Sequence, residues 1–194
     1  MNKQNIIIGI TIGDINGIGI EVILKALADN RILDNITPIV YGSAKIINYY
    51  KKGLNISGLY FNPISKVSSA IKHKCNVVNI INSDIIINQG TSSSISGELA
   101  FKSLKTATND LASGHIDVLI TAPINKKNIQ SADFNFPGHT EFLTKLSNED
   151  TSLMLMCFDN LKIGVATNHI SVSKISNSIN EDLLLKKIKT IQII

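Results

Sequence analysis

The sequence predicts an α/β fold, because short apolar runs of strand length alternate with stretches whose apolar residues recur at helical spacing. The run Ile6–Thr11 leads into a glycine-containing loop and then a helical pattern, and Ile36–Gly42 is also followed by a helical pattern. The 194 residues, of which 44% are hydrophobic and 18% charged, suffice for a globular chain with a sizeable core. This length fits one large domain, or one domain and part of another.

The expected elements follow one another in this alternating order. In the helix after the first strand, Ile20, Ile23, Leu24 and Leu27 share one face. Ser43 is a candidate N-cap for the helix after the second strand. The expected strands are residues 6–11, 36–42, 76–81 and 116–122, and the expected helices are residues 20–29, 44–52, 98–112, 141–146 and 180–194.

Two further apolar runs, residues 152–158 and 161–167, predict a β-hairpin, because Asp159 and Asn160 between them favour a tight turn. An antiparallel hairpin in a chain of alternating strands and helices predicts a mixed sheet. The last helix begins with acidic residues and continues with lysines, which suits the helix dipole. It has no stop signal before Ile194, so we expect the chain to be truncated within its fold.

Charge and cysteine usage argue against several kinds of partner. The net charge is +4, but Arg31 is the only arginine and the lysines are dispersed, which indicates a solvated surface rather than a nucleic-acid interface. Cys75 and Cys157 form no C-x-x-C pattern. The apolar part of the N-terminus is too short for a signal peptide, and no run approaches membrane-spanning length. We expect a cytoplasmic protein with reduced thiols, and neither nucleic acid nor membrane as a partner.

The loop after the first strand contains three glycines and an aspartate: Gly13, Asp14, Gly17 and Gly19. Glycines between a strand and a helix let the backbone approach a phosphate group, so these residues are candidates for cofactor binding. The Gly-x-x-x-Gly-x-Gly spacing is not the Rossmann fingerprint, and on spacing alone a tight structural turn explains it equally well. The serine-rich segment 88–97 leads directly into a helix, which favours a loop at an active-site edge over a linker.

The segment 116–142 carries most of the candidate site chemistry. Its first part is an apolar run that stops at Pro123, as expected of a buried strand that delivers its polar end to a sheet edge. Farther on, Gly138, His139 and Thr140 stand just before an expected helix. Backbone N–H groups, an imidazole and a hydroxyl at a helix N-terminus suit an anionic ligand.

Lysines and histidines in this region are ambiguous by spacing alone. Lys126 and Lys127 could hold a phosphate or carboxylate as point charges, but a pair of solvated loop side chains is the preferred interpretation. His139 and His169 are far apart in sequence and make no recognisable metal motif. Because a lone histidine is more often a surface or core residue, spacing alone predicts no metal site.

Four stretches of the sequence, taken together, are similar to a known family. They are Ile10–Glu21, Thr121–Lys127, Pro137–Phe142 and Val165–Ile170, and they occur in the family's order. With these motifs the chain resembles the 4-hydroxythreonine-4-phosphate dehydrogenases, the PdxA-type enzymes of pyridoxal phosphate synthesis, over essentially its whole length. A related glycine loop occurs in the isopropylmalate and isocitrate dehydrogenases, which share the fold and bind a nicotinamide cofactor without a Rossmann domain. The resemblance therefore implies a three-layer α/β/α architecture of the isocitrate/isopropylmalate dehydrogenase-like type.

The resemblance also assigns roles that spacing leaves open. His139 and Thr140 match the family's substrate-binding pair, and His169 matches the first of its three metal-ligand histidines. The other two histidines match nothing and are expected at the surface. The resemblance names no catalytic acid or base in this chain. The family more often has proline where this chain has Ile12, Ile15 and Ile20.

The activity implied by the resemblance is an oxidation followed by a decarboxylation. Members of the family that this chain resembles use NAD and a divalent metal to oxidise the secondary hydroxyl of 4-phosphooxy-L-threonine. Loss of CO2 then gives 3-amino-2-oxopropyl phosphate. NADP in place of NAD stays open, as does the choice among Zn, Mg, Co and Mn. In the family the active site lies at the interface of a homodimer.

Length is where the chain departs from the family, whose later half supplies two further metal-ligand histidines, phosphate-binding residues and much of the NAD site. We expect residues 1–122 to form a first lobe, incomplete without a C-terminal return, and residues 123–194 to begin a second lobe that carries the His-Thr and metal-histidine motifs. An uncovered sheet edge and helix face predict poor solubility or obligatory association. The alternatives are a non-catalytic fragment or anion-binding module on the same scaffold, or a related dehydrogenase acting on a cyclic diol carboxylate.

Overall fold

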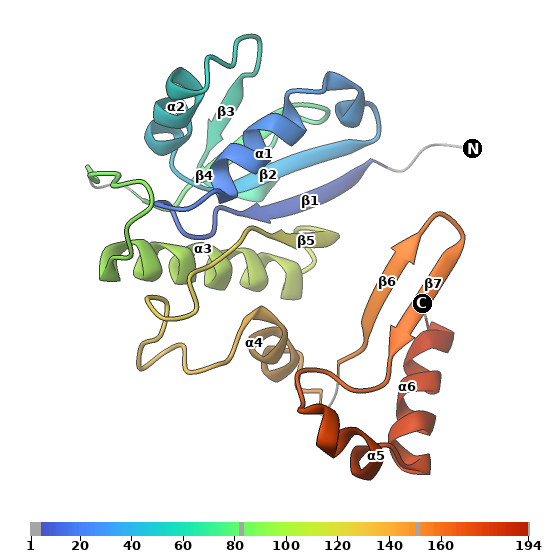
Figure 1. The fold of residues 1–194 in the computed structure, drawn as a ribbon. Helices are drawn as coiled ribbons and strands as arrows, with labels where there is room; N and C mark the ends of the chain where they lie inside the picture. The colour runs from blue at the N-terminus through green and yellow to red at the C-terminus, as the bar shows by residue number, and fades with distance from the viewer. Residues whose placement is uncertain (1–4, 82–83, 150–151, 194) are drawn as a thin grey trace. The chain divides into compact units, whose positions relative to one another are not determined.

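The computed structural model of the chain describes residues 5–81, 84–149 and 152–193 (Figure 1). The chain divides into two compact units, Met1–Leu143 and Thr144–Ile194, which are described in turn. None of the helices in the described ranges is long and apolar enough to cross a membrane.

The first unit is built on a five-stranded sheet in the order β3-β4-β2-β1-β5. Every pair of neighbouring strands in this sheet is parallel. A parallel sheet places the carboxyl ends of all its strands at one edge. The strands are β1 (Ile6–Thr11), β2 (Ile36–Gly42), β3 (Phe61–Ile64), β4 (Cys75–Asn79) and β5 (Val118–Thr121).

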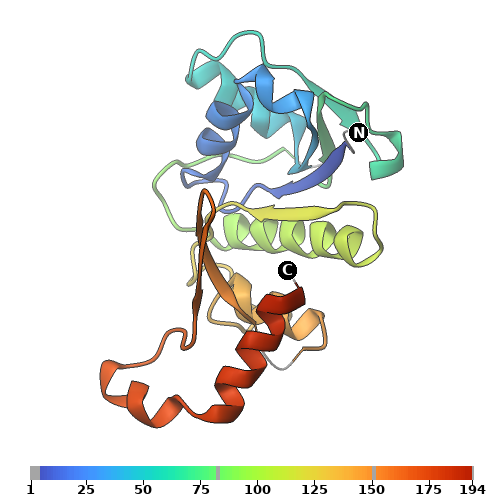
Figure 2. The same ribbon diagram turned by 90° about the vertical axis from the view of Figure 1, so that its right-hand side faces the viewer.

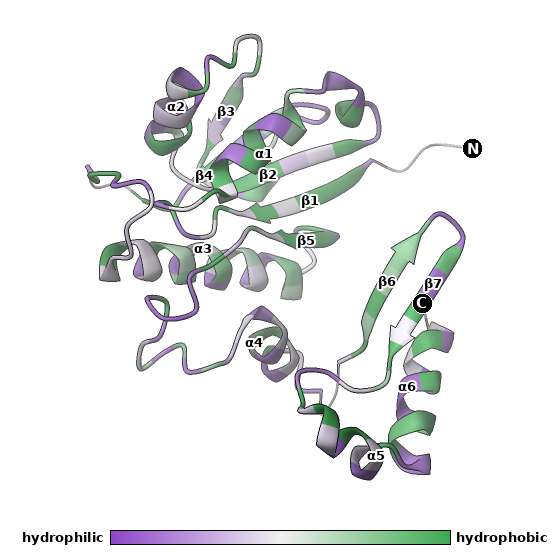
Figure 3. Ribbon diagram, viewed as in Figure 1, coloured by the Kyte–Doolittle hydropathy of each residue, from purple (hydrophilic) through white to green (hydrophobic). Residues whose placement is uncertain are grey.

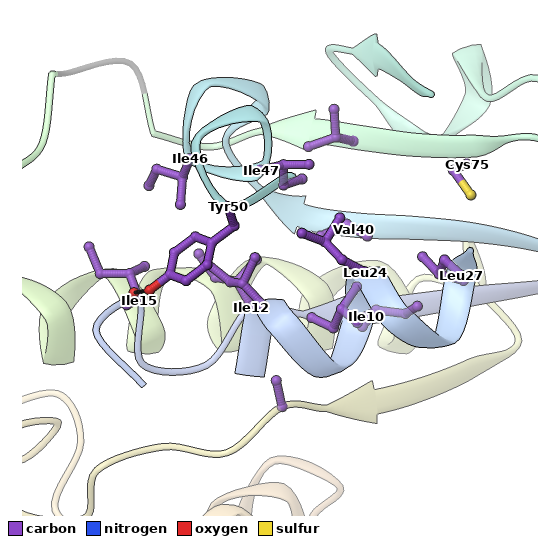
Figure 4. Close-up of a cluster of buried hydrophobic side chains, with 14 of the residues drawn as sticks. Ile10, Ile12, Ile15, Leu24, Leu27, Val40, Ile46, Ile47, Tyr50 and Cys75 are labelled. Carbon is purple, nitrogen blue, oxygen red and sulfur yellow. Dashed lines mark hydrogen bonds between the residues drawn. The ribbon is translucent and has the colours of Figure 1, made fainter. Parts of the chain in front are cut away.

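Helices cover both faces of this sheet, which gives the three-layer α/β/α arrangement that the sequence resemblance implies (Figures 1 and 2). On one face, α1 (Gly19–Leu27) and α2 (Ala44–Gly53) pack against β1, β2 and β4 in one apolar cluster. Figure 4 shows this cluster, in which the Tyr50 hydroxyl also donates a 2.6 Å hydrogen bond to the Ile15 carbonyl. Burial of such side chains contributes about 1.5–3 kcal/mol each to folding. The α/β fold class is thus confirmed.

On the opposite face lies α3 (Ser94–Ala112), which packs on the sheet through a second apolar cluster. The outer side of α3 carries a third cluster, formed with residues 124–143. Phe134 and Phe142 are buried there, and their rings lie 5.3 Å apart between centroids. Phe101 of α3 contacts both rings edge-on. The segment that follows β5 is therefore anchored on α3 by aromatic packing.

The second unit contains a hairpin of β6 (Met154–Phe158) and β7 (Leu161–Val165), followed by the short helix α5 (Ile175–Ser178) and by α6 (Glu181–Ile193). The hairpin and its turn are confirmed, with Asp159 at a φ of 50°. The expected mixed sheet is wrong for the described residues, because β6 and β7 pair only with each other. A two-residue turn lets antiparallel strands complete their shared hydrogen-bond ladder locally.

Most of the expected boundaries agree with the structure. The bounds of β1 and β2 are confirmed to the residue. Helix α3 begins four residues earlier than expected, at Ser94, because the Ser93 hydroxyl accepts a hydrogen bond from Ser96 N and caps the helix. Ser43 occupies the N-cap position of α2, but its side chain makes no capping bond. The Asn79 carboxamide accepts one from Ala44 N instead.

Two features of the sheet differ from expectation. The edge strand β3 lacks a sequence signal, because it is short and contains Pro63, a residue that argues against a strand. The strand β5 was expected to be buried, but it is the other edge of the sheet, where Val118 and Ile120 are 44% and 48% exposed. The boundary expected between lobes at residue 122 stays a prediction, because the compact units of this chain and the lobes of a longer enzyme are different divisions.

Candidate functional site

The candidate site lies at the carboxyl edge of the parallel sheet, where β1 and its neighbour β5 end. The segments that follow these two strands lie side by side. Ala122 N donates a 3.2 Å hydrogen bond to the Thr11 hydroxyl, and Asp14 N donates one of 3.0 Å to the Pro123 carbonyl. In open parallel sheets this edge is where ligands bind.

The glycines of the loop after β1 differ in what they do. Gly13 has a φ of +65°, and a Cβ there would lie 2.2 Å from the Pro123 carbonyl oxygen. A Cβ at Gly19 would lie 2.8 Å from the Ile12 carbonyl oxygen. Close packing therefore explains both of these glycines. A Cβ at Gly17 would lie no closer than 3.4 Å to its nearest neighbouring atom, the Asp14 carbonyl oxygen, which is an ordinary contact. Packing therefore does not explain Gly17.

Gly17 lines a cleft of about 350 Å³ at the sheet edge. Three segments that are far apart in sequence form its walls: residues 14–18, 90–92 and 123–125. The serine-rich segment after residue 88 therefore borders a cleft, as expected for a loop at a site edge. Seven of the ten lining residues are polar or glycine, which suits a polar ligand approached closely by the main chain.

A network of buried polar groups holds these walls together. Asp14 and Asn16 are only 6% and 5% exposed. The Asp14 carboxylate accepts hydrogen bonds of 2.9 Å from Asn16 N and from the Asn128 carboxamide. The Asn16 side chain accepts a bond from Asn88 N and donates one to the Thr91 carbonyl. Asp14 is thus held by neutral donors, which leaves its negative charge uncompensated by any ion pair within the described chain.

Sequence reasoning missed Asn16 and Asn128. Asn16 carried a weak signal, as a carboxamide inside a glycine loop. Asn128 carried none, because its contact with Asp14 joins residues 114 positions apart in sequence. The Asn128 carboxamide also donates to the Ser96 hydroxyl, and its oxygen is buried without a hydrogen-bond partner among the described residues.

A second group of candidate residues lies at the start of α4 (His139–Leu146). Helix α4 begins two residues earlier than expected, so His139 and Thr140 belong to its first turn instead of preceding it. His139 is half-buried, and its Nε2 atom is buried without a hydrogen-bond partner in the described part of the chain. Burial, and secondarily the charge of Lys126, lower the pKa of His139 below its usual value of 6.5. The imidazole is therefore neutral near pH 7.

His169 belongs to the second unit, in the exposed loop after β7. Within the described ranges no group of three or more histidine, cysteine, aspartate or glutamate side chains is arranged to hold a metal ion. A zinc site takes three or four protein ligands, and a single imidazole does not suffice to hold a cation. A metal held by His169 would therefore need ligands from outside these residues.

The remaining histidines and Cys75 have structural explanations. His73 and His115 are exposed, and each ring bonds locally, to the Leu33 carbonyl at 2.7 Å and to the Asp110 carboxylate at 3.0 Å. Burial raises the pKa of the Cys75 thiol to about 11, which keeps it protonated and unreactive.

Comparison with known proteins gives consistent relatives. The family described as "Pyridoxal phosphate biosynthetic protein PdxA" matches residues 34–193. A 4-hydroxythreonine-4-phosphate dehydrogenase of Bacteroides thetaiotaomicron is 38% identical over 189 residues, which are 97% of this chain and 52% of that protein. A protein of Oceanobacillus iheyensis with the provisional name D-threonate 4-phosphate dehydrogenase is 31% identical over 97% of this chain and 57% of its own length.

Solved structures agree with these relatives. The crystal structure of a 4-hydroxythreonine-4-phosphate dehydrogenase from Burkholderia phymatum matches this fold with a TM-score of 0.85 at 29% identity. The match covers 96% of this chain and 57% of that one. The chain thus spans about half the length of the curated relatives that it matches.

Proposed function

This chain belongs to the PdxA family, and from that membership we propose that it takes part in the NAD-dependent, divalent-metal-dependent oxidation of 4-phosphooxy-L-threonine. Decarboxylation of the product then yields 3-amino-2-oxopropyl phosphate for pyridoxal 5'-phosphate synthesis. The observation that carries the proposal is the 38% identity, over 97% of this chain, to a protein named for this dehydrogenase activity. A phosphorylated amino acid is the substrate, and the enzyme works in the cytoplasm.

The proposed cofactor site is the cleft beside the glycine loop, which Asp14 and Gly17 line. Gly13 and Gly19 belong to the proposed site as members of the same loop, but they do not line the cleft. The geometry around Gly17 supports this role, because packing does not require a glycine there and the main chain is open to a ligand. Asp14 is held by hydrogen bonds to Asn16 and Asn128, so its carboxylate keeps one orientation. We propose NAD rather than NADP as the nicotinamide cofactor.

The proposed substrate-binding pair is His139 and Thr140, at the N-terminus of α4. A helix N-terminus favours anions, and the neutral imidazole of His139 can donate a hydrogen bond to an oxyanion from one ring nitrogen. We propose His169 as one metal ligand, in a site completed by residues outside the described chain, at the interface of a homodimer. When bound, the cation would polarise the hydroxyl that is oxidised and NAD would accept the hydride.

A second substrate is favoured by one observation. The Oceanobacillus iheyensis relative carries the provisional name of a D-threonate 4-phosphate dehydrogenase. Both compounds present a phosphate and a secondary hydroxyl, so the same anion-binding group and cofactor cleft would serve either one. They differ in the substituent next to the hydroxyl, which is an amine in one substrate and a hydroxyl in the other.

The test is NADH formation, measured by absorbance, by the purified 194-residue chain with and without the later half of the Bacteroides thetaiotaomicron relative supplied as a second chain. Each substrate is supplied with NAD or NADP, and with Zn2+, Mg2+, Co2+ or Mn2+ in turn. We expect no turnover by the chain alone, because a metal held by His169 needs ligands from outside these residues. With the later half present we expect metal-dependent turnover with 4-phosphooxy-L-threonine and NAD, reduced at least about 100-fold by His169→Ala because a lost ligand weakens the metal site. His73→Ala, which removes an exposed imidazole that bonds the Leu33 carbonyl, serves as the matched control.

Two outcomes would contradict the proposal in different ways. Faster turnover of D-threonate 4-phosphate would assign the second substrate. No turnover with either substrate in the presence of the later half, by a chain whose circular dichroism shows it to be folded, would favour the non-catalytic alternative for this polypeptide.

A further inference from the structure

The structure distinguishes two adjacent lysines, Lys126 and Lys127, that the sequence leaves equivalent. Both side chains are exposed. Lys126 lies beside Gly138, since a Cβ built on Gly138 would be 3.7 Å from its Cε and 4.0 Å from its Nζ. Lys127 is not among the atoms nearest to that position, nor among the causes that lower the pKa of His139.

Hydrogen bonds of the surrounding backbone fix the position of Lys126. Asn125 begins a single helical turn, in which its side chain accepts a hydrogen bond from Lys127 N and its carbonyl one from Ile129 N. The Gln130 carboxamide then donates to two carbonyls, that of Lys126 at 3.0 Å and that of Phe136 at 2.9 Å. Gln130 thereby ties the turn that carries Lys126 to the segment that leads into α4.

Among the residues that the structure describes, no carboxylate forms an ion pair with the Lys126 ammonium. Glu141 Oε2 lies near Gly138 as well, 3.5 Å from the same built Cβ, yet in the described part of the chain no ion pair joins Glu141 to Lys126. Lys126 and Glu141 are the charged groups that the structure places beside Gly138. Burial and, secondarily, the Lys126 charge disfavour protonation of the His139 imidazole. Ionisable groups that are perturbed in this way cluster at binding sites.

We propose that Lys126 is a substrate-binding residue, which supplies the positive charge that pairs with the oxyanion of the ligand held by His139 and Thr140. The inference rests on the proposed function of that pair and adds a third member to it. The ammonium would attract a phosphate or carboxylate and donate a charge-assisted hydrogen bond to it. Its charge would also add to the effect of burial, which is the main cause of the lowered pKa of His139.

Gly138 has a role in the same arrangement. Its built Cβ would make only ordinary contacts, so folding does not demand a glycine there. Gly138 is buried, and the lack of a side chain there lets the Lys126 ammonium lie close to the first turn of α4.

The experiment is an NMR titration of the 194-residue chain, which follows the His139 imidazole signals, assigned with His139→Gln. The variants are Lys126→Gln and, as the matched control, Lys127→Gln; the probes are inorganic phosphate and acetate. We expect Lys126→Gln to raise the pKa of His139 and to weaken phosphate binding about tenfold, as for loss of one charge-assisted hydrogen bond. Lys127→Gln should change neither quantity, and Gly138→Ala should weaken binding while the pKa of His139 stays low.

Phosphate binding weakened more than acetate binding would assign the site to the phosphate end of the substrate, and the reverse result would assign it to the carboxylate end. The proposal is overturned if the wild-type chain binds neither anion, if both lysine variants behave alike, or if Lys126→Gln shifts the pKa of His139 without weakening binding. Because this readout needs no turnover, its result is separate from that of the dehydrogenase assay.

Discussion

Gly13 and Gly17 lie in one loop and lack a side chain for different physical reasons. The φ of +65° at Gly13 is strained for any residue with a Cβ, and the Pro123 carbonyl oxygen occupies the space that the Cβ would need. That carbonyl accepts the hydrogen bond from Asp14 N, so it cannot retreat without breaking the link between the segments after β1 and β5. Gly17 faces neither constraint.

We therefore expect Gly13→Ala to lower the free energy of unfolding by about 2 kcal/mol or more, because backbone strain and a steric clash add. Gly17→Ala is the matched control, and we expect it to change stability by less than about 1 kcal/mol. Urea unfolding followed by circular dichroism measures both. Equal losses in the two variants would show that the loop relaxes around an added Cβ.

At the scale of elements, α3 connects the sheet to the segment that carries the anion-binding residues. One face of α3 packs on the sheet and the other on residues 124–143. A buried hydroxyl fixes its position: Ser103 Oγ accepts a 3.1 Å hydrogen bond from Ile12 N and donates one of 2.6 Å to the Tyr41 carbonyl. Helix α3 is thereby bonded directly to the chain at the carboxyl ends of β1 and β2.

Removal of this hydroxyl by Ser103→Ala should lower the free energy of unfolding by about 1–3 kcal/mol, because a buried N–H and a buried carbonyl each lose a partner. Thr106→Ala is the control, since the Thr106 hydroxyl bonds only the Lys102 carbonyl of its own helix in an exposed setting. Thermal and urea unfolding report both values. A loss no larger than that of the control would mean that water replaces the Ser103 hydroxyl.

At the scale of the whole molecule, the two units differ in how well they bury apolar side chains. The first unit encloses three clusters of buried residues. In the second unit, β6 is apolar along its whole length, whereas β7 and α6 mix apolar and polar residues (Figure 3), and many of the apolar side chains face solvent. The large exposed hydrophobic residues of this unit include Met156, Phe158, Leu161, Ile163, Leu185 and Ile188. Exposed apolar side chains at this density mark a surface that associates.

We expect the 194-residue chain to self-associate in a concentration-dependent manner at micromolar concentrations, and Phe158→Asp combined with Leu161→Asp to shift it toward monomer. Phe158 is 82% exposed and Leu161 59% exposed, so the substitutions cost little folding stability. Tyr60→Asp, at a side chain that is 80% exposed in the first unit, is the control. Sedimentation velocity measures the distribution. A chain that stays monomeric throughout would contradict this expectation.

The sequence by itself determined those features that depend on neighbouring residues. The bounds of β1 and β2 follow from local apolar runs, and the β6–β7 hairpin from its two-residue turn. The family motifs identified His139, Thr140 and His169 as candidates, and their roles stay proposals.

The tertiary structure alone decided which distant groups meet. In the structure the two hairpin strands pair only with each other among the described strands, and β5 is an edge strand. The Asp14 carboxylate accepts a hydrogen bond from Asn128, and Lys126 rather than Lys127 lies beside Gly138. Such contacts arise from packing between segments far apart in the chain, where local periodicity carries no information. For the same reason a short strand such as β3, stabilised by its pairing with β4, left no signal in its own residues.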